Sequence, residues 1–193
     1  FGPQIRPVHR LDRVTAGCCI LARGLFGQQS LSDAFRRHRV DKRYLAVVEG
    51  APRFDKIAID APLSRVDSPN ARSGPMARQS VADDGKKALT RVWVRARGDG
   101  TALVEARPET GRMHQLRMHL AHVGHPILGD GQYGAVNGFQ PHALALLAWA
   151  VSFPAPKGGR RFVVDEVPPA FAVLIRDMVP DTTASIAAVF FFH

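Results

Sequence analysis

The chain has 193 residues, with 26 lysines and arginines against 17 acidic residues, which gives a formal net charge of +9. Its hydrophobic content of 46% is enough to build a core, so we exclude a chain that is disordered throughout and expect one globular domain over residues 1–193. No apolar run reaches the ~18 residues of a membrane span, and the only cysteines, Cys18 and Cys19, are neighbours that rarely form a disulfide. These features predict a cytoplasmic protein that does not associate with membranes.

Arginine dominates the basic residues, with 21 arginines against five lysines. The planar guanidinium fork fits phosphate oxygens, so an arginine-rich chain with a high isoelectric point favours a polyanionic partner such as RNA. A solvated basic surface without a nucleic-acid partner is the alternative.

The first quarter of the chain predicts one loop, two strands and a helix. Residues 1–13 combine basic side chains with two prolines and predict a loop. The apolar run Ala16–Ala22 predicts a short strand buried on both faces. Apolar residues at helical spacing predict a helix from about Gly27 to Arg39, and Tyr44–Val48 predicts a strand.

The middle of the chain predicts a long loop followed by a hairpin. Ile57–Ile59 predicts one short strand, and residues 61–84 predict a mobile basic loop. The alternating segments Leu89–Ala96 and Ala102–Ala106 flank Gly98–Gly100, which is typical of a β-hairpin.

The last third predicts two helices and two strands. Met113–Val123 has helical spacing, Leu144–Phe153 and Arg161–Val164 predict strands, and Ala170–Met178 predicts a helix. The mixture of hairpins and helices predicts an α+β fold with a mixed, mainly antiparallel sheet and flanking helices. No role is predicted for the apolar tail, residues 184–193.

Asp12 lies between two arginines in the segment His9-Arg10-Leu11-Asp12-Arg13. The neighbouring positive charges are expected to lower the pKa of this carboxyl and keep it ionised, as a nucleophile or a base requires. A salt bridge within an ordinary loop is the alternative interpretation.

A second group of candidate residues runs from Arg112 to His125. On a helix, His114, Arg117 and His122 would share one face. Four histidines in this segment suggest a metal site, but their spacing matches no zinc pattern, so no metal is predicted. The alternatives are a helix that faces phosphate and pairs with a carboxylate, or histidines that only hydrogen-bond the backbone.

Two further motifs are weaker. Tyr44 begins a strand behind Lys42 and Arg43, where its ring could stack on a base or simply pack in the core. The turn Gly129–Gly134 has three glycines but lacks the pattern of a phosphate-binding loop, so no nucleotide site is predicted there.

Taken together, these segments resemble the RNA pseudouridine synthases of the RluA branch. The resemblance rests on the segments 9–17, 42–50 and 85–90 and on the long run Glu109–Gly134, and it spans about residues 7–175. It implies the pseudouridine synthase catalytic-domain fold. Members of the family usually have two strands upstream of the segment that carries the aspartate, whereas eight residues precede His9 here.

The resemblance implies a role for individual residues. Asp12 would be the catalytic aspartate, Tyr44 would stack on the uracil and assist proton removal at carbon 5, and Arg117 would pair with Asp12. Arg10 would fill the gap left by the flipped base, and Leu146 would pack beneath that base. The full set expected to contact substrate RNA is His9, Arg10, Arg13, Arg112, His114, Gln115 and Leu146.

The implied activity is isomerisation of a specific uridine in structured ribosomal or transfer RNA. The family uses no cofactor and no metal, and we expect a monomer that needs no protein partner. Two alternatives remain at this point: an RNA-binding remnant of the same fold without catalytic activity, and a metalloenzyme built on the histidines.

Overall fold

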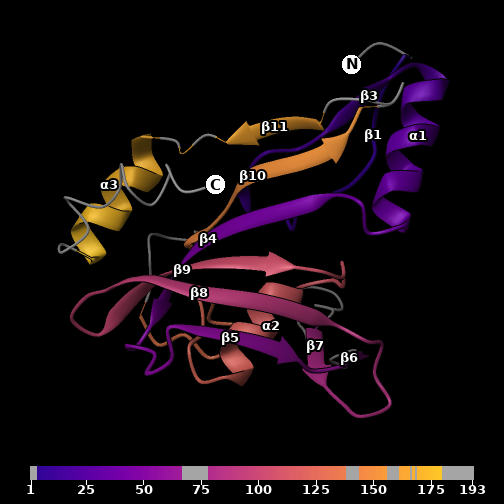
Figure 1. The fold of residues 1–193 in the computed structure, drawn as a ribbon. Helices are drawn as coiled ribbons and strands as arrows, with labels where there is room; N and C mark the ends of the chain where they lie inside the picture. Colours follow the sequence, from indigo (N-terminus) through magenta and orange to yellow (C-terminus); the bar gives the residue numbers. More distant parts are fainter. Residues whose placement is uncertain are drawn as a thin grey trace, which may run out of the picture.

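The computed structural model describes residues 4–66, 78–137, 144–155, 161–165, 167 and 169–179. Three helices and eleven strands occur in this part of the chain (Figure 1). In chain order they are β1 Ile5–Pro7, β2 Ala16–Gly17, β3 Leu21–Arg23, α1 Gly24–Arg36, β4 Asp41–Glu49, β5 Lys56–Asp60, β6 Leu63–Val66, β7 Arg78–Val81, β8 Leu89–Arg97, β9 Thr101–Pro108, α2 Gln115–His122, β10 Leu146–Pro154, β11 Arg161–Asp165 and α3 Pro169–Met178.

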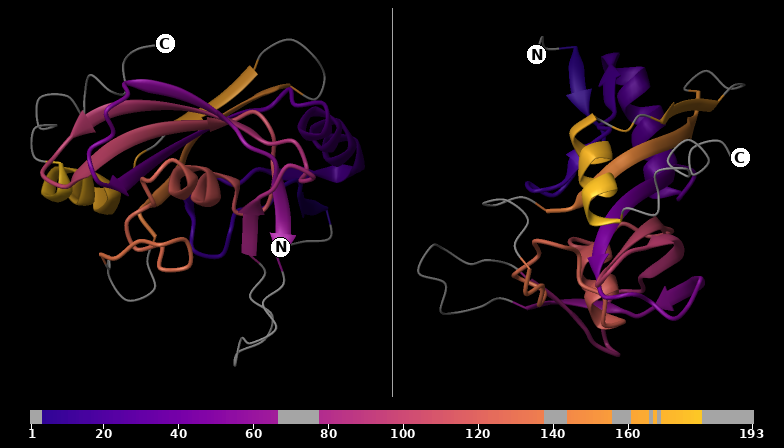
Figure 2. Two further views of the ribbon diagram at one scale, coloured as in Figure 1. Left: turned by 90° about the horizontal axis from the view of Figure 1, so that it is seen from below. Right: turned by 90° about the vertical axis from the view of Figure 1, so that its left-hand side faces the viewer.

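The main sheet confirms the predicted α+β class with mainly antiparallel pairing. Its strands run in the order β11-β10-β4-β9-β8-β5, all antiparallel, and β2 adds a short parallel pairing to β10. The pairs β1-β3 and β6-β7 form two small separate sheets. The main sheet arches over α2, and α1 lies at the end of the molecule that carries β1 and β3 (Figures 1 and 2). No helix in the described ranges is long and apolar enough to cross a membrane.

The core is centred on β4. Leu45, Ala46, Val47 and Val48 are all 0% exposed, so this continuous apolar run is buried on both faces of the sheet. Successive side chains alternate between the two faces. Lys42 and Tyr44 therefore lie on the same face as Ala46. This is the face that α2 covers, because Lys42 and Tyr44 line one cavity with Arg117 of α2.

The predicted hairpin is confirmed, and its two strands are longer than the predicted segments Leu89–Ala96 and Ala102–Ala106. β8 and β9 pair antiparallel, with a register shift between Val94 and Ala96. Gly100, with φ of 70°, adopts the left-handed conformation that the turn between them requires.

The prediction that Ala16–Ala22 forms one strand buried on both faces is wrong. The segment divides into β2 and β3, which belong to different sheets, and Ala16, Gly17, Cys19 and Leu21 are exposed. Gly17 has φ of 113°, and a Cβ atom at this position would lie 2.2 Å from the carbonyl oxygen of Ala148. Only glycine allows the chain to approach β10 this closely and then leave it.

Other differences concern the ends of elements. The helix predicted over Gly27–Arg39 is α1, which begins and ends three residues earlier. Its end is consistent with His38, which adopts φ of 53° and cannot continue the helix. Within residues 1–13, β1 is a strand that pairs with β3. The segment 61–84, predicted as a loop, contains the hairpin strands β6 and β7. The part between them and the tail 184–193 lie outside the described residues.

Candidate active site

A cavity of about 400 Å³ opens on the face of the main sheet that α2 covers. Its walls are the loop after β1, β4, the end of β9, the loop before α2, the first turns of α2 and the start of β10. Segments far apart in sequence therefore meet here. Eight of the ten residues predicted to act in the site line this cavity together: His9, Arg10, Asp12, Tyr44, Arg112, Gln115, Arg117 and Leu146.

Asp12 lies in the loop between β1 and β2. A turn places it, because the backbone N–H of Thr15 donates to the Asp12 carbonyl at 2.9 Å. Its carboxylate forms no hydrogen bond or ion pair with any described residue, so the predicted alternative of a loop salt bridge to Arg10 or Arg13 is not observed in this part of the chain. The carboxylate is available to a ligand in the cavity.

Tyr44 comes from β4 and is half-buried in the cavity wall. Burial, and next the negative charge of Asp12, raise the pKa of the Tyr44 phenol to about 12. The phenol is therefore protonated at neutral pH. It can offer an aromatic face and a hydrogen-bond donor to a ligand.

Lys42 lies two residues before Tyr44 on the same strand and lines the same cavity. Its Nζ donates to the Thr110 carbonyl at 2.8 Å. Burial lowers the pKa of Lys42 to about 8, and Asp41 opposes this shift. This cationic group was not among the predicted site residues, although the two-residue period of a strand places it beside Tyr44.

Arg117 enters the cavity from α2, but its hydrogen-bonding partner differs from the predicted one. The guanidinium donates to both carboxylate oxygens of Asp130, from Nε at 2.7 Å and from Nη2 at 2.6 Å. No hydrogen bond or ion pair joins it to Asp12 within the described ranges. Hydrogen bonding and charge from Asp130 raise the pKa of Arg117 against the effect of burial, and Asp12 adds a smaller contribution.

Gln115 stabilises the loop that forms one cavity wall. Its Oε1 accepts from the Thr110 hydroxyl at 2.7 Å and from the Arg112 N–H at 3.0 Å. Its Nε2 donates to the Leu89 carbonyl and to Thr90 Oγ1, both at 3.0 Å. The amide of Gln115, predicted to contact RNA, is thus occupied by internal hydrogen bonds although the residue lines the cavity.

Three other predicted RNA contacts differ in their surroundings. His9 lines the cavity, where its Nε2 accepts from the Ile20 N–H at 2.8 Å and its ring stacks on Phe35. Burial, together with the charge of Lys42, lowers the pKa of His9, which keeps the ring neutral. Arg112 is exposed at the rim, with Nε donating to the Lys87 carbonyl. Arg13 is exposed and is not part of the described cavity wall.

The predicted helix Met113–Val123 begins only at Gln115, because His114 adopts a left-handed conformation with φ of 51°. His114 Nδ1 lies 2.9 Å from the Tyr133 hydroxyl, and the residue is not among the described cavity-lining residues. The prediction that His114, Arg117 and His122 share a helix face is therefore wrong.

The four histidines of this segment have separate surroundings. His119 is fully buried between Thr90 and the Ala61 carbonyl, His125 contacts the Glu49 carbonyl, and His122 is exposed. Across the described ranges, no three His, Cys, Asp or Glu side chains are placed to hold one metal ion.

Comparison with known proteins agrees with this arrangement. The family model described as RNA pseudouridylate synthase matches residues 2–122. An uncharacterized RNA pseudouridine synthase of Zymomonas mobilis is 48% identical over 130 residues, which are 66% of this chain and 57% of that protein. The ribosomal large subunit pseudouridine synthase C of Yersinia pestis is 35% identical over 82% of this chain and 50% of that protein.

A solved structure supports the fold as well. Human RNA pseudouridylate synthase domain containing 1 superposes with a TM-score of 0.74 at 29% identity, covering 86% of this chain and 70% of that one. The chain spans about half the length of the curated relatives that it matches. With the family model matching more than half of its residues, the chain belongs to the RNA pseudouridylate synthase family.

Proposed function

We propose that this chain converts uridine to pseudouridine in RNA, as an isomerase that uses Asp12 in the cavity described above. One observation carries the proposal. Asp12, Tyr44 and Arg117 come from a loop, a strand and a helix, yet they line one cavity of about 400 Å³ together with the apolar side chain of Leu146. A carboxylate, an aromatic ring, a cation and an apolar surface are the groups that a flipped uracil requires.

The proposed reaction balances without a cofactor. The bond from N1 of uracil to C1′ of ribose breaks, the base rotates, and a bond from C5 to C1′ forms. The proton leaves C5, and N1 ends the reaction protonated. Asp12 is the acidic side chain on the cavity wall, and its free carboxylate fits attack on the nucleotide or removal of a proton.

The remaining cavity residues receive supporting roles. Because the Tyr44 phenol is protonated at neutral pH, we assign it stacking and hydrogen bonding rather than a role as a phenolate base. Arg10 and Arg112 are exposed at the cavity and supply positive charge for RNA phosphates. Arg10 is also in place to fill the gap left by the flipped nucleotide, since it lies two residues from Asp12.

We propose ribosomal RNA as the first substrate to examine, because three matched relatives carry the name ribosomal large subunit pseudouridine synthase. Transfer RNA is the second. We further propose that the chain acts in the cytoplasm, as a monomer and without a protein partner.

The test compares this chain with Asp12→Asn and with a control variant, Asp33→Asn. Asp33 is a second aspartate beside arginines, in α1 and outside the cavity. Pseudouridine is measured by mass spectrometry in ribosomal and transfer RNA transcripts incubated with each protein. We expect product from the chain and from Asp33→Asn, and a loss of about 10³-fold or more in rate for Asp12→Asn.

A folded chain that binds these RNAs and forms no pseudouridine would contradict the proposal. That outcome would favour the RNA-binding remnant. Equal rates for Asp12→Asn and the unchanged chain would reject Asp12 as the catalytic group.

A further inference from the structure

The turn that follows Leu128 holds a buried carboxylate next to the cavity. Asp130 is 2% exposed, and its backbone is fixed by three hydrogen bonds: its N–H donates to the Ile127 carbonyl, and its carbonyl accepts from Tyr133 and Ala135. Burial and two hydrogen bonds from Arg117 also leave the side chain little freedom to move. Asp130 is therefore a fixed anion at the edge of the site.

This anion binds one edge of the Arg117 guanidinium. Nε and Nη2 donate to the two oxygens of Asp130, and Nη2 also donates to Gln132 Oε1 at 2.9 Å. The Tyr133 ring lies 5.0 Å from the guanidinium carbon. The same turn thus contacts the edge and a face of Arg117.

The opposite edge of Arg117 is different. Its Nη1 forms no hydrogen bond or ion pair with any described residue, while the Arg117 side chain is only 8% exposed and lines the cavity with Asp12. A guanidinium is planar and rigid, so fixing the Nε and Nη2 edge also fixes the direction of Nη1. The two N–H groups of Nη1 thus have no partner among the described residues, in a side chain that lines the cavity.

We propose that Asp130 is a positioning residue that holds Arg117 with its Nη1 edge directed at Asp12 and the bound nucleotide. This inference rests on the proposed function, and it assigns a role to a turn that does not itself line the described cavity. In this arrangement Asp12 keeps a cation nearby while its carboxylate oxygens remain free to react. A direct Arg117–Asp12 pair would occupy those oxygens before substrate arrives.

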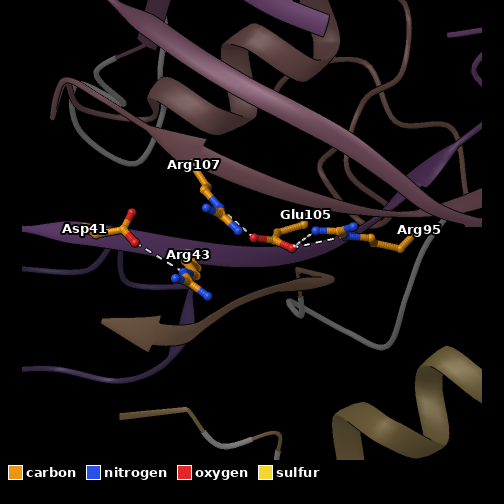
Figure 3. Close-up of polar contacts among 5 residues, drawn as sticks. All are labelled: Asp41, Arg43, Arg95, Glu105 and Arg107. Carbon is orange, nitrogen blue, oxygen red and sulfur yellow. Dashed lines mark hydrogen bonds and ion pairs between the residues drawn. The ribbon is translucent and has the colours of Figure 1, made fainter. Parts of the chain in front are cut away.

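A purely structural ion pair would behave differently. The structure offers a matched example in Glu105, which is 2% exposed and accepts from Arg95 and Arg107 (Figure 3). Glu105 pairs with Leu45 across the strands, and so lies on the face opposite Tyr44. Breaking this pair changes the stability of the protein and leaves the cavity groups in place, so Glu105→Gln is the control.

The test is a double-mutant cycle with Asp130→Asn, Arg117→Lys and the double variant. Asn keeps the size of the side chain and loses the charge and one acceptor. For Asp130→Asn we expect kcat to fall about 100-fold, KM to change by less than about threefold, and Asp130→Glu to recover part of the loss. In the Arg117→Lys background the same change should reduce kcat by less than about threefold.

A second readout does not depend on activity. The Arg117 Nε–H signal in a ¹⁵N-arginine NMR spectrum should be protected from exchange, lost in Asp130→Asn and retained in Glu105→Gln. An Nε–H signal that is unaffected by Asp130→Asn, an unchanged kcat, or losses that multiply in the double variant would each overturn the inference. If the unchanged chain forms no pseudouridine while its Nε–H signal follows the expected pattern, the proposed function fails and the Asp130–Arg117 assignment stands.

Discussion

Among the residues that the structure describes, two buried carboxylates each bind arginine, on opposite sides of the main sheet. Asp130 and Arg117 have side chains that are 1% and 8% exposed, and both are shielded from water. Glu105 is equally buried, but each of its partners, Arg95 and Arg107, is 32% exposed (Figure 3). The first pair fixes a cation toward a cavity, whereas the second neutralises charge under an open sheet face. The two clusters therefore differ in how deeply the arginine is buried, and not in how deeply the carboxylate is buried.

The largest expected difference between the two clusters is in stability. Asp130→Ala leaves a buried guanidinium without its partner and should reduce the free energy of unfolding by about 3 kcal/mol. Glu105→Ala leaves arginines that can turn into solvent, so its cost should be about 1 kcal/mol. Urea unfolding of both variants measures these values. An equal or reversed order would mean that exposure of the cation does not decide the cost.

The aromatic residues beside the two clusters allow a second comparison. Tyr44 faces the cavity, while Trp93 lies under Arg107 on the other face, with the guanidinium carbon 4.9 Å from its ring. Tyr44→Phe removes the hydroxyl and should lower kcat about 100-fold, because the hydrogen bond that this hydroxyl donates to the bound nucleotide is lost. Trp93→Phe should leave kcat unchanged. Single-turnover pseudouridine formation measures both, and a similar loss in the two variants would remove the distinction between the faces.

The smallest expected effect is on the pH dependence of the unfolding free energy, to which the buried histidine His119 of α2 contributes. Burial lowers the pKa of His119, so the unfolded chain binds protons more readily than the folded one. The contribution of neutral His119 to the unfolding free energy is therefore fully present at pH values above 6.5, the pKa of an unperturbed histidine. It is lost as the pH falls below that value. His119→Gln should therefore flatten the decline in unfolding free energy between about pH 7.5 and pH 5. His122→Gln, an exposed histidine of the same helix, is the control, and equal flattening in both would contradict the assignment.

Local patterns predicted most of the fold. The apolar run at Tyr44–Val48 and the alternation on either side of Gly100 identified β4, β8 and β9 because strand periodicity is a property of neighbouring residues. The split of Ala16–Ala22 was not predictable in this way. It depends on the contact between Gly17 and Ala148, which no local pattern reveals.

The same distinction applies to the site. Asp12, Tyr44 and Arg117 were singled out from motifs, and all three line the cavity, although their catalytic roles stay predictions. The partner of Arg117 was missed. Arg117 binds Asp130 rather than Asp12 because the turn from Gly129 to Gly134 brings Asp130 to the guanidinium. Both end glycines of this turn have positive φ. The position of the turn next to α2 is a tertiary feature that the local sequence does not reveal.

The position of β10 has a consequence for synthesis on the ribosome. β10 lies between β4 and β11 in the main sheet. It also pairs with β2, whose last residue, Gly17, follows Asp12 by five residues. An emerging chain can form the β8–β9 hairpin early, but the segment that follows Asp12 cannot make its pairing with β10 until β10 has left the exit tunnel. The cavity is therefore assembled late in translation, and a nascent chain interrupted before Leu146 carries Asp12 without the site that would use it.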